Sequence, residues 1–199
     1  QRGAIVGQRG QVVLSGTHVG CTTERHNGWC EYDGKVSAVV RAGGETLLYF
    51  RQNHKHHGGR FVGYARAATP TSRFGDIQQI EVRSWDASGP GNLYFAAVDN
   101  HPLDNRTLLG LFPTNEGRQG QDNGDGSSYV GLAVSCDGAH WSALTPLVWS
   151  SGKEGRTLDQ PVDGFKRTVD DNVVFWVQYG VPYIATDWRE TTRVDEYVM

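Results

Sequence analysis

Strand-length runs of apolar residues, each bounded by turn-forming residues, recur along this chain. The three strongest are Thr-Leu-Leu-Tyr-Phe at 46–50, Thr-Leu-Leu-Gly-Leu-Phe at 107–112 and Asn-Val-Val-Phe-Trp-Val at 172–177. Runs of this length, rich in β-branched and aromatic residues, predict buried β-strands. Long stretches with the 3.6-residue period of a helix are scarce, so the pattern predicts an all-β protein.

The most clearly patterned local unit is the stretch 127–148. A small and apolar run at 129–134 leads to Asp137-Gly138, a dipeptide typical of hairpin turns, and a second strand is expected at 141–148. Asp137 and Ser135 are suited to bond the turn's own amides, while the ring of Trp141 covers the hairpin. We interpret this unit as a rigid structural corner, with Cys136 buried at the strand end.

The same plan occurs three times, which predicts radial repetition of sheets, as in a β-propeller. The units comprise about four strands each and are bounded at 31–84, 85–150 and 151–199. Their expected strands are 34–41, 46–50, 59–67 and 74–82, then 91–98, 107–112, 129–134 and 141–148, then 161–167, 172–177, 181–186 and 193–199.

Three units are fewer than a closed ring needs, because propellers typically have four to eight blades. Residues 1–30 form an N-terminal segment in which only 11–15 is a plausible strand, and this strand is a candidate to close the ring. The pattern therefore predicts a partial or processed chain, and another chain that completes the propeller is the alternative.

Charge and hydropathy exclude some partners. The 199 residues carry 19 basic and 22 acidic side chains, a net charge of -3, which gives no electrostatic case for nucleic acid or an anionic membrane. No apolar run approaches the ~20 residues of a membrane-spanning helix. Neither a nucleic-acid partner nor a membrane span is predicted.

Two features favour an oxidising, extracytoplasmic location. Cys21 and Cys30 flank a loop rich in Gly, Asn and Thr and are candidates for a small disulfide, with three unpaired cysteines as the alternative. Asn105 begins an Asn-Arg-Thr triplet, the acceptor sequence for N-glycosylation, in an expected turn. Together they predict a secreted protein.

Acidic and aromatic residues gather where the innermost strand of each unit is expected to begin. Carboxylates from separate units can divide acid and base roles, because burial and mutual repulsion separate their pKa values. Glycoside hydrolysis needs such a pair at roughly 5 to 9.5 Å. The candidate catalytic residues are Asp33, Asp86, Asp159 and Asp163, and the candidates to hold or stack on a sugar are Trp29, Glu31, Trp85 and Arg156.

This arrangement resembles the five-bladed propeller glycosidases of the invertase, levansucrase and arabinanase type. The hairpin at 135–141 also resembles a degenerate sialidase Asp box. The resemblance implies that Asp33, at the start of the first inner strand, is the nucleophile or base, and that Asp86 fixes geometry and pKa. The acid in those families is a glutamate from a later blade, where this chain offers Asp159 or Asp163.

Each aspartate also has a structural interpretation. Asp33 and Asp163 each precede a glycine and suit a turn, Asp159 precedes Gln160-Pro161 and suits a loop, and Asp86 lies in a loop by composition. Two functions follow. The first is a carbohydrate-active, glycoside hydrolase-like propeller, and the alternative is a non-catalytic glycan-binding or structural subunit of a larger assembly.

No cofactor is predicted, although two stretches have metal-ligating residues. His54, His56 and His57 are suited to Zn or Cu, but the following Gly58-Gly59 favours a solvated loop. The acidic, glycine-rich run 116–126 has oxygen ligands at alternate positions, as Ca²⁺ sites do, but it lacks the spacing of an EF-hand loop and is interpreted as a linker.

Overall fold

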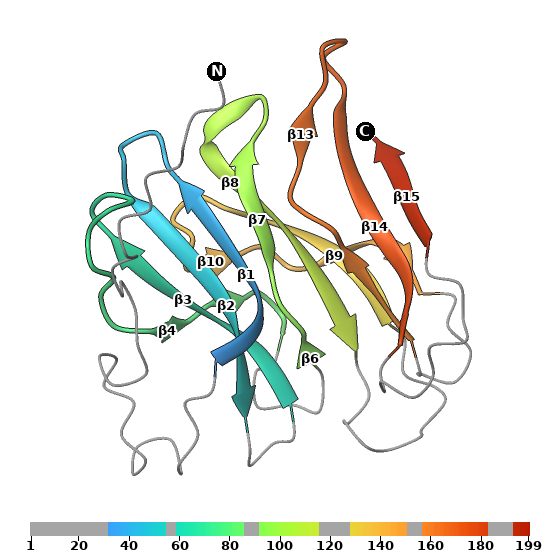
Figure 1. Cartoon of the computed structure of the whole chain (residues 1–199), viewed down its shortest axis with the longest axis horizontal. Helices are drawn as coiled ribbons and strands as arrows, with labels where there is room; N and C mark the ends of the chain where they lie inside the picture. The colour runs from blue at the N-terminus through green and yellow to red at the C-terminus, as the bar shows by residue number, and fades with distance from the viewer. Residues whose placement is uncertain (1–31, 55–58, 86–91, 116–127, 151–156, 183–192) are drawn as a thin grey trace, which may run out of the picture.

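A computed structural model describes residues 32–54, 59–85, 92–115, 128–150, 157–182 and 193–199, and these form strands, turns and bends without a helix. The protein is therefore all-β, as its pattern predicts. Three main sheets follow one another along the chain and stand side by side, from β1–β4 on the left of Figure 1 to β12–β15 on the right. We call them the first, second and third sheets.

The first sheet has the order β1-β2-β3-β4, and its main strands are antiparallel. Its strands are β1 (Tyr32–Val40), β2 (Thr46–His54), β3 (Gly59–Ala67) and β4 (Gln78–Gln79). Leu47 and Tyr49 of β2 point to one face, and Leu48 and Phe50 point to the other, as strand alternation requires. The expected strand at 74–82 is broken, since only β4 joins this sheet and β5 (Glu81–Val82) leaves it.

The second sheet has the order β11-β9-β8-β6, and β7 also pairs with β8. Its strands are β6 (Asn92–Leu93), β7 (Ala97–His101), β8 (Asp104–Asn115), β9 (Ser128–Ser135) and β11 (Thr145–Trp149). In place of the expected strand at 91–98, the structure has two short strands, β6 and β7, which both pair with β8. The expected strand at 141–148 is also divided, because β10 (His140–Trp141) pairs in parallel with β5.

The third sheet differs most from the sequence-based expectation. Its strands are β12 (Thr157–Pro161), β13 (Lys166–Arg167), β14 (Val173–Pro182) and β15 (Arg193–Val198). Both β12 and β13 pair with one edge of β14, and β15 pairs with the other. Val181 and Pro182 therefore extend β14, and the rest of the expected strand at 181–186 lies outside the described residues. The expected strand at 161–167 is interrupted by bends at 162–164.

The core lies between the sheets. Strand β8 supplies both interfaces, because Leu108 and Phe112 pack toward the first sheet while Leu109 and Leu111 pack toward the third. Gly110 leaves room on the first of these faces, since a Cβ atom there would lie 2.8 Å from the Trp141 ring. Face-to-face packing through apolar strands thus joins all three sheets.

Candidate functional site

The first strand longer than two residues is β1 in the first sheet, β7 in the second and β12 in the third, and side-chain hydrogen bonds link β1 to β7 and to β12. Ser37 of β1 donates its hydroxyl to the Val98 carbonyl of β7 at 3.0 Å and accepts the Val98 amide at 3.0 Å. Asn100 of β7 donates from Nδ2 to the Val40 carbonyl at 2.9 Å. Lys35 of β1 reaches β12 of the third sheet, where Nζ donates to the Pro161 carbonyl at 2.9 Å. This meeting of first strands is where the sequence predicts the chemistry.

Lys35 contacts all three sheets. Its Nζ also donates to the Val162 carbonyl and lies 5.3 Å from the centroid of the Phe95 ring, in the segment between β6 and β7 of the second sheet. Burial lowers the pKa of Lys35, and the nearby negative charge of Asp163 opposes that shift. The side chain is directed there by an irregularity in β1, where the register with β2 shifts between Asp33 and Val36. Sequence reasoning missed Lys35; its position two residues after Asp33 is the one signal that could have found it.

Asp159 is a buried carboxylate, only 2% exposed, on β12. The Gly180 amide of β14 donates to its Oδ1 at 3.1 Å, whereas its Oδ2 has no hydrogen-bond partner in the described part of the chain. The register of β12 with β14 shifts between Leu158 and Gln160, so Asp159 lies at a β-bulge. Bulges re-aim side chains and are common beside active sites.

Asp163 is an exposed member of an ion-pair cluster. Lys166 Nζ lies 3.4 Å from its Oδ2 and 2.6 Å from Oδ2 of Asp99 on β7. Burial alone would raise the pKa of Asp163, but the Gly164 amide and the Lys166 charge lower it overall. A lowered pKa keeps Asp163 ionised, which suits an ion-pair partner better than a general acid.

Asp33 lies at the start of β1, opposite Arg51 of β2 in the sheet register. Of the remaining candidates, Trp85 is described: it packs partly buried against the core between the first and second sheets. That packing favours a core role for Trp85 over a sugar platform. Asp86, Trp29, Glu31, Arg156 and the pair Cys21 and Cys30 lie outside the described residues.

Asn105 is exposed near the start of β8, so its side chain is accessible, and its glycosylation stays a prediction. On β2 and β3, the guanidinium groups of Arg51 and Arg60 lie 4.7 and 5.2 Å from the ring centroid of Tyr94. This stack of two arginines on one tyrosine is a feature that sequence reasoning did not find, because its members come from two different sheets.

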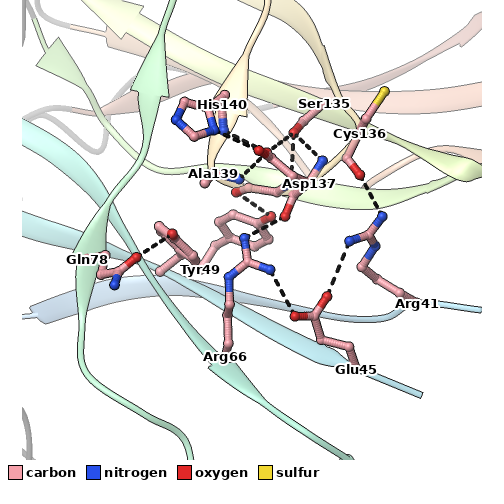
Figure 2. Close-up of polar contacts among 12 residues, drawn as sticks. Arg41, Glu45, Tyr49, Arg66, Gln78, Ser135, Cys136, Asp137, Ala139 and His140 are labelled. Atoms are coloured by element: carbon pink, nitrogen blue, oxygen red, sulfur yellow. Dashed lines mark hydrogen bonds and ion pairs between the residues drawn. The ribbon is translucent and has the colours of Figure 1, made fainter. Parts of the chain in front are cut away.

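The 135–141 hairpin of the second sheet contacts residues of the first sheet through a set of polar contacts (Figure 2). Oδ1 of Asp137 accepts the amides of Ala139 and His140, each at 2.8 Å, and the Ser135 hydroxyl accepts the Gly138 amide at 2.8 Å. These are the turn bonds that the residue pattern predicts. Burial alone would raise the pKa of Asp137, but hydrogen bonds from His140, Ala139 and Ser135 lower it well below its usual range.

Side chains of the first sheet donate hydrogen bonds to the main chain of this hairpin. The buried Tyr49 hydroxyl donates to the Gly138 carbonyl at 2.9 Å, and burial raises the pKa of that phenol, so it stays a donor. Arg66 donates to the Asp137 carbonyl at 2.7 Å and Arg41 to the Cys136 carbonyl at 2.6 Å, while Glu45 pairs with both arginines. The expectation of a buried Cys136 is wrong: the residue is exposed, because it follows the buried Ser135 at the end of β9 and successive side chains point to opposite sides.

Among the described residues, no group of three His, Cys, Asp or Glu side chains could hold a metal ion. The side chains of the histidine run at 54–57 and the acidic run 116–126 lie outside that part of the chain. The described segments also contain no helix of the length and apolarity needed to cross a bilayer.

The chain is similar to two solved glycosidase structures at low sequence identity. An endo-arabinase from Bacteroides thetaiotaomicron shares 16% identity with a TM-score of 0.48, over 82% of this chain and 55% of that protein. A glycosyl hydrolase from Bacteroides ovatus shares 12% identity with a TM-score of 0.35, over 85% of this chain and 68% of that protein. No protein-family model matches the chain, and no curated protein sequence matches it significantly. The chain thus spans little more than half the length of the arabinase.

Proposed function

We propose that the three sheets are blades of a β-propeller that acts on carbohydrate as a glycoside hydrolase. The observation that carries this proposal is the buried carboxylate of Asp159, whose Oδ2 has no partner among the described residues. A buried polar atom without a partner is costly, by about 1 to 3 kcal/mol, and persists where a ligand or water completes it. In this proposal a sugar oxygen becomes that partner once Oδ2, which is closed to solvent in this structure, is made accessible.

In this proposal Asp159 is the general acid and Asp33 is the nucleophile or base. Asp33 lies on β1 and Asp159 lies on β12, and the hydrogen bond from Lys35 of β1 to the Pro161 carbonyl of β12 links these two strands directly. A general acid protonates the oxygen of the leaving sugar, and an ionised carboxylate attacks the sugar or activates water. Asp163, ionised beside Lys166, is assigned to the ion pair.

The test is hydrolysis of polysaccharides by the full chain. The protein is incubated with a panel that includes arabinan and levan, and the release of reducing sugar is measured. For a substrate that the wild type cleaves, Asp33→Asn and Asp159→Asn should each lower kcat by at least about 10²-fold. Asp163→Asn is the matched control and should retain most of the rate. Full activity of Asp159→Asn would refute the assignment.

A second candidate function is a non-catalytic subunit of a larger assembly. It is favoured by apolar residues on the third sheet that remain open to solvent, since Val194 and Val198 of β15 are 56% and 59% exposed. Both alternate along β15 with residues that face the second sheet, such as Tyr197. A protein with this role would bind carbohydrate or a further sheet and release no sugar in the same assay.

A further inference from the structure

Two arginines of the first sheet stack on one tyrosine that belongs to the second. Arg51 of β2 and Arg60 of β3 place their guanidinium groups 4.7 and 5.2 Å from the centroid of the Tyr94 ring. Arg51 is opposite Val62 in the register of β2 with β3, and strand alternation puts Val62 and Arg60 on the same face. The two positive charges are therefore no more than about 10 Å apart, one Debye length at 0.1 M salt, so solvent ions screen their repulsion only in part.

The main chain on both sides of this stack is held in place. The Arg60 amide donates to Oδ1 of Asn92 at 2.6 Å, and Asn92 is only 4% exposed. The Tyr94 amide donates to the Pro113 carbonyl of β8 at 2.9 Å, and the Tyr94 side chain packs, partly buried, against the apolar core of the second and third sheets. The stack is thus preorganised, so a ligand would not have to order it on binding.

Arg60 lacks the acidic partner that other stacked arginines have. Among the described residues, the Arg60 guanidinium has no hydrogen-bond or ion-pair partner, and its Nε is closed to solvent. A partly buried guanidinium without an acceptor is unfavourable unless another group supplies one. The other arginine–tyrosine stacks in the described part of the chain each include an acid at 2.8 to 3.1 Å, namely Arg66 on Tyr64 with Glu45, and Arg193 on Tyr179 with Asp195.

We propose that Arg51 and Arg60 bind the carboxylate of an acidic sugar, an inference that rests on the proposed function and assigns its substrate to polysaccharides that contain uronic acid. A guanidinium binds a carboxylate through two parallel N–H donors, and such a charge-assisted pair is stronger than a neutral hydrogen bond. The bound carboxylate supplies the negative charge that the other stacks take from their own acids. Asp33 is opposite Arg51 in the register of β1 with β2, so the strand of the proposed nucleophile adjoins this site.

The experiment measures binding of polygalacturonate to the full chain by isothermal titration calorimetry, with arabinan and levan as neutral polysaccharides. The wild type should bind polygalacturonate at least about 10-fold more tightly than either neutral polymer, and Arg60→Gln should lose about 10-fold in affinity for polygalacturonate. Arg193→Gln removes a stacked arginine that has its own acid, so this control should keep the wild-type affinity. Should Arg60→Gln not fold, Arg60→Lys supplies the comparison, because it keeps the charge, loses the two parallel donors and should bind several-fold more weakly.

The outcomes separate this inference from the proposed function. Equal affinity of the wild type and Arg60→Gln for polygalacturonate would overturn the inference, and so would equally tight binding of dextran sulfate, which carries no carboxylate. Cleavage of arabinan or levan by a protein that does not bind polygalacturonate would support the hydrolase and overturn the uronic-acid assignment. Binding of polygalacturonate that depends on Arg60, in a protein that releases sugar from no polysaccharide, would support the carboxylate site and refute the hydrolase.

Discussion

The two junctions between neighbouring sheets are built in different ways. The first and second sheets are joined by a hairpin whose main-chain carbonyls accept donors from Tyr49, Arg66 and Arg41. The second and third sheets are joined by apolar packing, in which Leu109 and Leu111 of β8 share a buried cluster with Phe165 and Phe175, and by the Lys166–Asp99 ion pair. Both junctions have apolar packing, but the first depends in addition on the exact path of a backbone, whereas the second adds one partly exposed charge pair.

This difference teaches where the fold tolerates change. Buried hydrogen bonds to a main chain lose their geometry when the backbone shifts by a fraction of an ångström. Apolar packing adapts more easily when its total volume is kept. We therefore expect glycine substitutions at the first junction to cost more stability than equivalent substitutions at the second.

The largest effect is expected for Gly138→Ala. Gly138 has a φ of +81°, and a Cβ atom there would lie 2.4 Å from Leu47 Cδ1 and 2.7 Å from the Tyr49 hydroxyl oxygen. Left-handed strain and overpacking together should lower the free energy of unfolding by roughly 2 to 4 kcal/mol. Urea unfolding at neutral pH measures this.

Gly44→Ala is the matched control for this substitution. Gly44 has a similar φ of +86°, but a Cβ atom there would meet nothing within 4 Å. The free energy of unfolding of this variant should fall only by the cost of the left-handed backbone, about 1 to 2 kcal/mol. Equal losses in the two variants would show that the close approach of the hairpin to the first sheet adds nothing to stability.

A smaller effect is expected for Gly164→Ala at the second junction. A Cβ atom there would lie 2.7 Å from the Asp99 Cβ, so Asp99 must move, and with it the oxygen that pairs with Lys166. No positive φ adds strain, so the free energy of unfolding should fall by about 1 to 2 kcal/mol. Gly43→Ala, which meets nothing within 4 Å, is the control and should be neutral or slightly stabilising. A larger loss for Gly164→Ala than for Gly138→Ala would reverse the comparison.

What the sequence predicts well is local. The turn bonds of Ser135 and Asp137 form between residues at most three positions apart, and the residue types alone specify them. The central strands were predicted for the same reason, because alternation and apolar runs act within one strand. The all-β class follows from these features.

What the sequence does not predict is long-range. The pattern predicts that a new strand begins at Val181, yet Val181 and Pro182 continue β14, where they pair with β12. The partner of Lys35 lies 126 residues away, and nothing near Lys35 indicates it. The exposure of Cys136 follows from which face of β9 packs against the first sheet, since Ala133 and Ser135 are buried there. Such facts depend on how sheets meet, which local propensity does not encode.

The smallest effect is expected from the charge of Asp137 in the first junction. Asp137→Asn keeps an oxygen that can accept the Ala139 and His140 amides but removes the charge that faces the His140 ring, whose Nδ1 lies 2.7 Å from Oδ2. The Asp137 side chain is 48% exposed, so solvent weakens the effect, and the loss at pH 7 should be about 1 kcal/mol or less.

The pH dependence of that loss separates its two sources. The pKa of Asp137 is depressed on folding, so its contribution is complete above the unfolded value of about 4 and is lost as pH falls through the folded value. The pKa of His140 is raised, chiefly by Asp137 and further by Glu81, so its contribution is complete below about 6.5 and is lost as pH rises through the folded value. The stability difference between wild type and Asp137→Asn should therefore be largest between about pH 4 and 6.5. Urea unfolding from pH 3 to 9 tests this. The control is His140→Gln, which should keep the loss of stability at acid pH and remove the loss at neutral pH. If the stability curves of wild type and Asp137→Asn run parallel across this range, the hairpin is held by its hydrogen bonds alone and the charge of Asp137 contributes nothing to the junction.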